Sequence, residues 1–182
     1  KSIFIMPILI DSNNFSVNLF NQNPFFLNWF KGAGEHYLLN YILPSEDIDI
    51  INILNKNIES LENYNYSSII KKYEVEDFII CLIFHDKNEI RVLSKITINN
   101  QEKIQNNIYN NINLDNDDEL ISLIISIKNN YEDNWKKINL INRSVKLPLS
   151  ISVDANDYQK NRLFKEFLNN TEFVSNFFIK DF

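Results

Sequence analysis

The sequence has few of the residues from which small proteins most often build chemical sites. Its 182 residues include two glycines, four prolines, two histidines and one cysteine. The single cysteine, Cys81, excludes an internal disulfide and a zinc site made of several cysteines. The histidines, His36 and His85, lack the H-x-H or H-x-x-x-H spacing of metal-binding pairs, so we expect no metal and no other cofactor.

The sequence also lacks a long apolar run and a basic stripe. Its longest apolar run, residues 78–84, is much shorter than the ~20 residues that a transmembrane helix needs. The formal net charge is −6, and an acidic chain repels the phosphate backbone of nucleic acid. Hydrophobic residues make up 45% of the chain, which is typical of a globular protein with a packed core. We therefore expect no transmembrane segment in this chain and no nucleic-acid partner.

The two glycines, Gly32 and Gly34, stand in the stretch "FKGAGEH" and suggest at first a phosphate-binding loop. A dinucleotide-binding loop needs a third glycine and leads from a strand into a helix. Here the expected order is reversed, with a helix before the glycines and a strand after them. We interpret the glycines as the end of a helix, where one of them adopts a positive φ.

Hydrophobic periodicity and end signals divide the rest of the chain into helices and strands. The pattern predicts strands at residues 2–11, 15–20, 36–44, 77–84, 89–98, 145–153 and 173–182. It predicts helices from Asn23–Pro24 to the glycines and at residues 45–58, 66–73, 116–138 and 157–168, while residues 99–116 fit either an edge strand or a loop. The first helix should bury an aromatic face of Phe25, Phe26, Trp29 and Phe30.

This alternation of strands and helices predicts an α/β fold in which helices cover a sheet. We divide the chain into a larger domain, residues 1–141, and a small strand–helix–strand unit, residues 142–182. The small unit would leave an open sheet edge for further chain or a partner to cover. The first residue is Lys1 rather than Met, which suggests a trimmed chain or a processed precursor.

Acidic residues near position 47 are the main candidates for chemistry. Glu46, Asp47 and Asp49 could act with His36 in a small-molecule or nucleotide-binding protein or enzyme. The competing interpretation is structural, because acids are favoured in the first turn of a helix. Residues 115–119 allow the same two interpretations, and in both clusters we favour the helix cap.

Cys81 and His85 do not form a nucleophile and base pair. Four residues apart on one strand, they would be separated by roughly 13 Å, which is too far for proton transfer. We expect Cys81 to be buried and His85 to lie at a turn.

Several stretches occur in an order that resembles a known family: "LFNQNPFFLNWF", "YILPSEDIDI", "IIKKYEVEDFIICLIF", "NNYEDNWKKINLI" and the run from residue 147 to residue 179. The family is a proteobacterial group of uncharacterised proteins, domain of unknown function two thousand and sixty-six. The positions that match its pattern are Asn23, Pro24, Trp29, Pro44, Asp47, Tyr73, Asp77, Trp135, Lys136 and Val174. Glu46 and Glu74 stand where the family pattern has glycine.

The resemblance implies an exported protein, periplasmic or associated with the bacterial envelope. It implies a first domain similar to the N-terminal domain of TolB and a last part similar to half of a ferredoxin-like domain. It transfers no catalytic residue. We therefore expect a non-enzymatic protein that acts through protein contacts, and a weaker alternative is a module that adds a peptide strand to an exposed sheet edge.

Overall fold

The computed structural model describes residues 1–12, 14–31, 38–86, 89–139, 151 and 157–171. The chain divides into two compact units, Lys1–Ile138 and Asn139–Phe182. The described residues form a mixed α/β structure with six strands and five α-helices. In the part of the chain that the structure describes, no helix is both long and apolar enough to cross a lipid bilayer.

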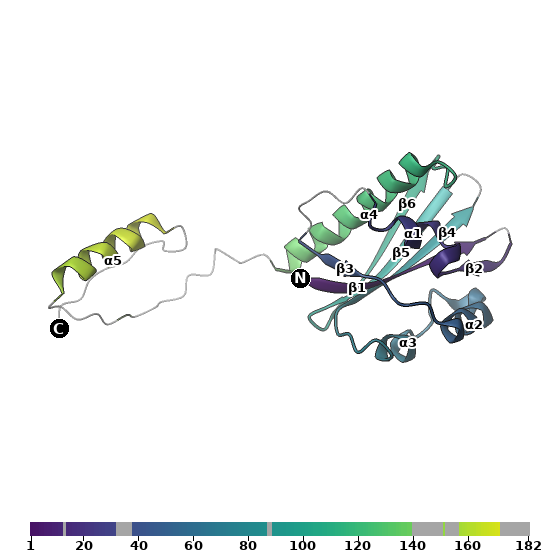
Figure 1. Ribbon diagram of the computed structural model, residues 1–182, viewed down its shortest axis with the longest axis horizontal. Helices are drawn as coiled ribbons and strands as arrows, with labels where there is room; N and C mark the ends of the chain where they lie inside the picture. The colour runs from purple at the N-terminus through teal and green to yellow at the C-terminus, as the bar shows by residue number, and fades with distance from the viewer. Residues whose placement is uncertain (13, 32–37, 87–88, 140–150, 152–156, 172–182) are drawn as a thin grey trace. The chain divides into compact units, whose positions relative to one another are not determined.

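The first unit is built on one mixed sheet (Figure 1). Its strands are β1 (Ser2–Asp11), β2 (Ser16–Asn18), β3 (Asn40–Ile42), β4 (Phe78–Asp86), β5 (Glu89–Ile98) and β6 (Gln101–Asn110). The order is β2-β1-β4-β5-β6, and β3 also pairs with β1. Strand β1 runs parallel to β3 and β4, whereas the other pairs are antiparallel. The segment 99–116, for which the sequence left a strand or a loop open, thus contains the edge strand β6.

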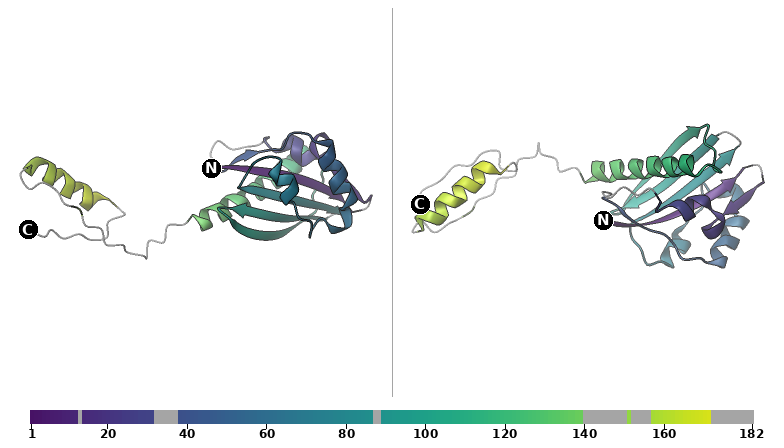
Figure 2. Two further views of the ribbon diagram at one scale, coloured as in Figure 1. Left: turned by 90° about the horizontal axis from the view of Figure 1, so that it is seen from below. Right: turned by 45° about the horizontal axis from the view of Figure 1, so that its top comes forward.

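Helices cover both faces of this sheet, and two cores result (Figure 2). Helices α1 (Pro24–Asn28) and α4 (Asp117–Ile138) lie on one face, while α2 (Ile48–Lys56) and α3 (Ser67–Lys71) lie on the other. Strand β1 is buried along almost its whole length because its alternate side chains enter the two cores. Two short 3₁₀ helices, Phe20–Gln22 and Ile58–Ser60, lie in the connections.

Pro7 lies in the middle of β1, where a proline would normally interrupt the ladder. Strand β1 pairs with β4 along Phe4–Asp11, but on its other side β3 covers only residues 2–4 and β2 only residues 9–11. The Pro7 carbonyl accepts a hydrogen bond from Asn23 Nδ2 at 3.0 Å. The main-chain nitrogen and carbonyl of Pro7 therefore point to the side of β1 that lacks a strand. The missing N–H of Pro7 therefore breaks no bond of the ladder.

Most predicted elements are present, and the differences lie at their ends. Helix α2 begins at Ile48 rather than residue 45, because Asp47 caps it. In the described part of the strand predicted at residues 36–44, residues 38–44, the strand is Asn40–Ile42. The prediction that the first helix buries Phe30 is wrong, since Phe30 is 58% exposed. Phe25 and Trp29 are fully buried, as predicted.

The second unit is described only in helix α5 (Tyr158–Asn170) and a few residues beside it. The side chain of Asp157 accepts a hydrogen bond from the Lys160 amide at 3.0 Å and caps the helix. The predicted strand at 145–153, except residue 151, the predicted strand at 173–182 and the glycines Gly32 and Gly34 lie outside the described residues.

Candidate functional site

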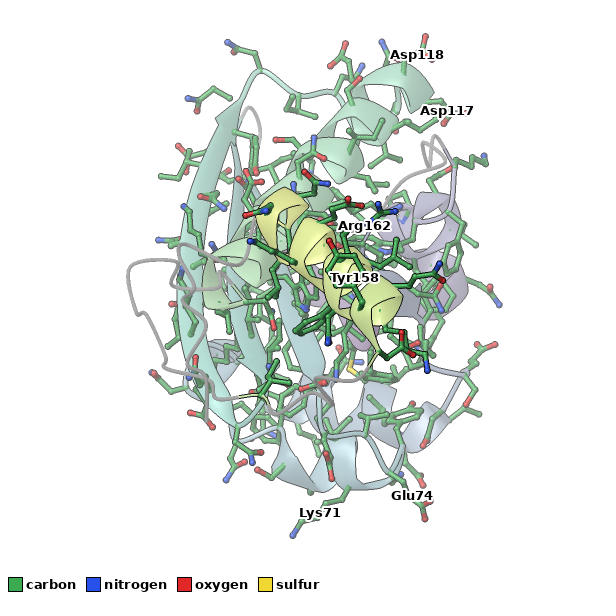
Figure 3. All side chains as sticks on the ribbon, turned by 90° about the vertical axis from the view of Figure 1, so that its left-hand side faces the viewer. Lys71, Glu74, Asp117, Asp118, Tyr158 and Arg162 are labelled. Atoms are coloured by element: carbon green, nitrogen blue, oxygen red, sulfur yellow. The ribbon has the colours of Figure 1, made fainter. Side chains whose placement is uncertain are left out.

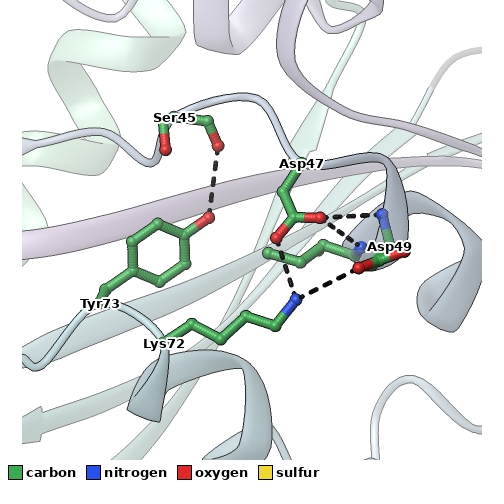
Figure 4. Close-up of polar contacts among 6 residues, drawn as sticks. Ser45, Asp47, Asp49, Lys72 and Tyr73 are labelled. Atoms are coloured by element: carbon green, nitrogen blue, oxygen red, sulfur yellow. Dashed lines mark hydrogen bonds and ion pairs between the residues drawn. The ribbon is translucent and has the colours of Figure 1, made fainter.

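Asp47 forms the best-defined polar contact among the predicted site residues (Figure 4). One of its carboxylate oxygens accepts hydrogen bonds from the amides of Asp49 and Ile50, at 2.8 and 3.4 Å. The other accepts from Lys72 Nζ at 3.0 Å. The Lys72 hydrogen bond lowers the pKa of Asp47; burial opposes this, and the two amides support it. Asp47 is therefore an ionised helix cap.

The neighbouring acids also have structural partners. Asp49 Oδ2 lies 3.9 Å from Lys72 Nζ, and its side chain is 82% exposed. Glu46 accepts a hydrogen bond from Asn21 Nδ2 at 3.3 Å, on a different element. His36 lies outside the described residues. Among the residues whose positions are described, no three His, Cys, Asp or Glu side chains are grouped to hold a metal ion.

Tyr73 and Asp77 hold the segment after α3 in place. The Tyr73 hydroxyl donates to the Ser45 carbonyl at 3.3 Å, and its ring lies 4.7 Å from that of Phe4. Burial raises the pKa of Tyr73, and the charge of Asp47 adds to this. Asp77 pairs with Lys1 and accepts from the Asn99 amide at 2.8 Å; burial raises its pKa, but these two donors outweigh burial and the pKa is lowered.

The Asn23–Pro24 pair begins helix α1. Asn23 is fully buried, and its side chain accepts from the Phe25 amide at 3.0 Å while it donates to Pro7. Pro24 occupies the first helical position, where its missing N–H is harmless. The family-pattern residues Asn23 and Pro24 are thus a buried cap that ties α1 to the centre of the sheet.

Trp29, at the end of α1, contacts a buried lysine that was not predicted from the sequence. Lys128 of α4 is 1% exposed and donates to the Trp29 carbonyl. Its Nζ lies 5.4 Å from the centre of the Trp29 ring and 5.7 Å from that of Tyr41, so both aromatic faces surround the ammonium group. Burial lowers the pKa of Lys128.

Glu132, one turn after Lys128, is a second buried ionisable side chain that sequence reasoning missed. Its carboxylate accepts from the amides of Leu38 and Leu39, at 3.1 and 2.7 Å, and is 4% exposed. A signal for both residues exists in the helical period, because Ile124, Lys128 and Glu132 follow each other at intervals of four. Together Lys128 and Glu132 join α4 to α1 and to the segment before β3.

A third buried polar group lies between β5 and α4. The hydroxyls of Ser94 and Tyr131 are 2.7 Å apart, and both residues are buried. Cys81 beside them is buried as predicted, and burial raises the pKa of its thiol to about 12 although Tyr131 and Ser94 hydrogen-bond to it. A thiol with so high a pKa is a poor nucleophile at neutral pH.

The remaining residues of the family pattern have structural positions or lie on the surface. Pro44 is buried. Trp135 of α4 is partly buried and packs against the core that α1 and α4 share with the sheet. Lys136 Nζ lies 3.4 Å from Asp133 Oδ1 on the surface of α4. Val174 lies outside the described residues.

Strand β6 lies at one edge of the sheet and carries two exposed apolar side chains. Strand β6 pairs along its full length with β5, and no described residue pairs with its other side. Ile104 and Ile108, two residues of one face, are 68% and 55% exposed. We call the outer side of β6, with Ile104 and Ile108, the β6 edge.

Comparisons with models of protein families, with curated proteins and with solved structures found no match.

Proposed function

We propose that this chain is a non-enzymatic protein of the bacterial envelope that works by binding another protein chain through the β6 edge. The observation that carries the proposal is the exposure of Ile104 and Ile108 on a ten-residue strand whose outer side pairs with no described residue. A long, exposed strand edge presents a row of main-chain donors and acceptors to any extended segment.

The two ends of the sheet differ in a way that supports this choice. The side of β1 away from β4 is covered by β2 and β3, which contribute three residues each and leave little edge to extend. No strand among the described residues covers the outer side of β6. Strand β6 contains no proline, and its two charged residues, Glu102 and Lys103, are adjacent near one end. Proteins that avoid edge pairing usually place charges or prolines along such a strand.

The ionisable groups of the candidate site support binding rather than catalysis. Lys128 donates to a main-chain carbonyl, and Glu132 accepts from main-chain amides. Asp47 caps a helix. Each of these groups thus has a structural task in the fold that accounts for its position.

The envelope location and the family are part of this proposal, and one backbone feature supports them. Glu74 stands where the family pattern has glycine, and its φ is 51°, in the left-handed region that favours glycine. We propose on this basis that the first unit is a TolB N-terminal-like domain and the second a half-ferredoxin-like unit.

The proposal can be tested in the cells that produce the protein. A photo-cross-linking amino acid is placed at Asn106, in the exposed middle of β6, and as a control at Asp118, which projects outward at the start of α4 (Figure 3). We expect a defined protein adduct from position 106 and none from position 118, with the protein in the envelope fraction. The absence of any adduct at 106, or a cytosolic location, would overturn the proposal.

A further inference from the structure

The faces of β6 differ in what they contact. Lys103 donates to Asn134 Oδ1, and the Tyr109 hydroxyl accepts from Asn130 Nδ2 at 3.1 Å, so this face is held against α4. The opposite face carries Ile104 and Ile108 and is exposed at every position of the strand. A strand added beyond β6 would therefore extend the sheet beside two exposed isoleucines.

The sequence of this exposed face is nearly symmetric about Asn106. Ile104 and Ile108 lie two residues to either side, and Glu102 and Asn110 lie four residues to either side. When two copies of the strand run antiparallel with Asn106 opposite Asn106, Ile104 of each copy stands directly opposite Ile108 of the other. Cross-strand pairs of β-branched residues in direct opposition stabilise a sheet.

The same register also keeps like charges apart. Glu102 stands opposite Asn110, and on the other face Lys103 stands opposite Tyr109. No two like charges face each other, although the whole chain carries a net charge of −6. A shift of one residue would place each isoleucine opposite a residue from the α4-facing side of the other copy. The pairing of Ile104 with Ile108 would then be lost.

We propose that the partner of the β6 edge is β6 of a second copy of this chain, paired antiparallel about a two-fold axis at Asn106. This inference rests on the proposed function and names its partner. The result is a dimer with one continuous sheet, in which Ile104 and Ile108 of both copies form a single apolar strip.

The purified chain of residues 1–182 tests the inference directly. Analytical ultracentrifugation should give twice the chain mass of 21.6 kDa for the native sequence at micromolar concentration. The double substitution Ile104→Lys and Ile108→Lys should halve that mass, because four like charges would meet in one strip. The matched control is Ile48→Lys, since Ile48 is 71% exposed on α2 and away from β6. The control should remain a dimer, and circular dichroism should show all variants folded.

A cysteine substitution tests the register without disturbing the fold. Asn106→Cys places one cysteine opposite itself across the two-fold axis, and the native Cys81 is buried and does not interfere. Mild oxidation should convert most of this variant to a disulfide-linked dimer. Asn110→Cys, whose copies would lie roughly 26 Å apart in this register, should remain unlinked.

Two results would overturn the inference. One is a native chain that sediments as a monomer, and the other is equal disulfide cross-linking of the variants Asn106→Cys and Asn110→Cys. If the purified chain is a monomer while position 106 forms an adduct with a different protein in cells, the proposed function stands and only the identity of the partner is wrong.

Discussion

Lys128 shows how a single buried charge can organise one side of this protein. Its ammonium group binds the Trp29 carbonyl at the end of α1, where main-chain carbonyls lack helical partners. The rings of Trp29 and Tyr41 surround it, so the lysine connects α4, α1 and β3. Removing it would leave a buried carbonyl without this donor and a gap between two aromatic rings.

We expect Lys128→Ala to lower the free energy of unfolding by about 2–4 kcal/mol, because a charged hydrogen bond and its packing are both lost. The control is Lys137→Ala, an exposed lysine of the same helix, which should change stability by less than about 0.5 kcal/mol. Urea unfolding followed by circular dichroism measures both. Equal effects of the two substitutions would show that Lys128 has no special role.

A second prediction concerns Asp47 and the way in which folding stability depends on pH. Its pKa in the folded chain is below the ordinary value of 3.8, mainly through Lys72, so its stabilising effect is complete above that value. The effect is lost as the pH falls through the lowered pKa of the folded state. Asp47→Asn keeps a side chain that can cap the helix but removes the charge, and we expect stability to fall less steeply in acid.

The check is denaturant unfolding of the native chain and Asp47→Asn at neutral and acidic pH. Asp49→Asn is the control, because the Asp49 side chain is 82% exposed and its Oδ2 lies 3.9 Å from Lys72 Nζ. The prediction fails if Asp47→Asn and the native chain have parallel pH profiles.

At the scale of elements, the end of α3 contains local strain. Glu74 follows α3 with a φ of 51°, and a residue with a Cβ atom pays about 1 kcal/mol or more for that conformation. Figure 3 shows Glu74 projecting outward near Lys71, so its side chain adds no core contact. The chain keeps this turn because Tyr73 and Asp77 on either side are bonded to Ser45 and Asn99.

We expect Glu74→Gly to raise the free energy of unfolding by about 0.5–1 kcal/mol, since relief of strain outweighs the greater freedom of glycine in the unfolded chain. Glu76→Gly, at an exposed position without positive φ, should lower it instead. Thermal unfolding of both variants measures the difference. A loss of stability in Glu74→Gly would contradict the assigned strain.

At the scale of the whole molecule, both cores of the sheet come from the first unit. The buried residues of the two clusters lie between Ile3 and Tyr131, on the strands, on helices α1 to α4 and in the connections between these elements. Helix α5 has no fully buried residue, and its Leu163 and Phe167 are 59% and 62% exposed. The buried side chains of both described cores are therefore all supplied by Lys1–Ile138.

We expect a chain of residues 1–138 to fold on its own and to unfold in one cooperative transition, close to the corresponding transition of the full chain. Thermal unfolding and the dispersion of amide signals in a ¹⁵N-correlation spectrum would establish this. An aggregated or unstructured product would mean that residues 139–182 complete the first unit.

Local signals in the sequence predicted much of this fold. The apolar run of residues 2–11, the hairpin of β4 and β5, and the spaced apolar positions of α4 are all present. The asparagine and proline at 23 and 24 and the acids near 47 marked two helix starts, because caps and end signals act within one turn of chain.

The candidate surface was only half predictable. Segment 99–116 was compatible with a strand or a loop, because its exposed face mixes isoleucine with amides and a charge and gives no clear buried stripe. Its pairing with β5 made it a strand, and its place at the end of the sheet left Ile104 and Ile108 exposed. Neither fact can be read from ten residues alone.

The sequence by itself determined the mixed α/β class, the positions of most elements and the residues that begin helices α1 and α2, since these depend on neighbours within a few positions. Only the tertiary structure decided the strand order, the burial of Lys128 and Glu132, and which strand became the free edge. Those properties depend on contacts between residues tens of positions apart, such as Lys128 with Trp29. The helical period aligns Lys128 and Glu132 with Ile124, but it does not give the partners that bury them.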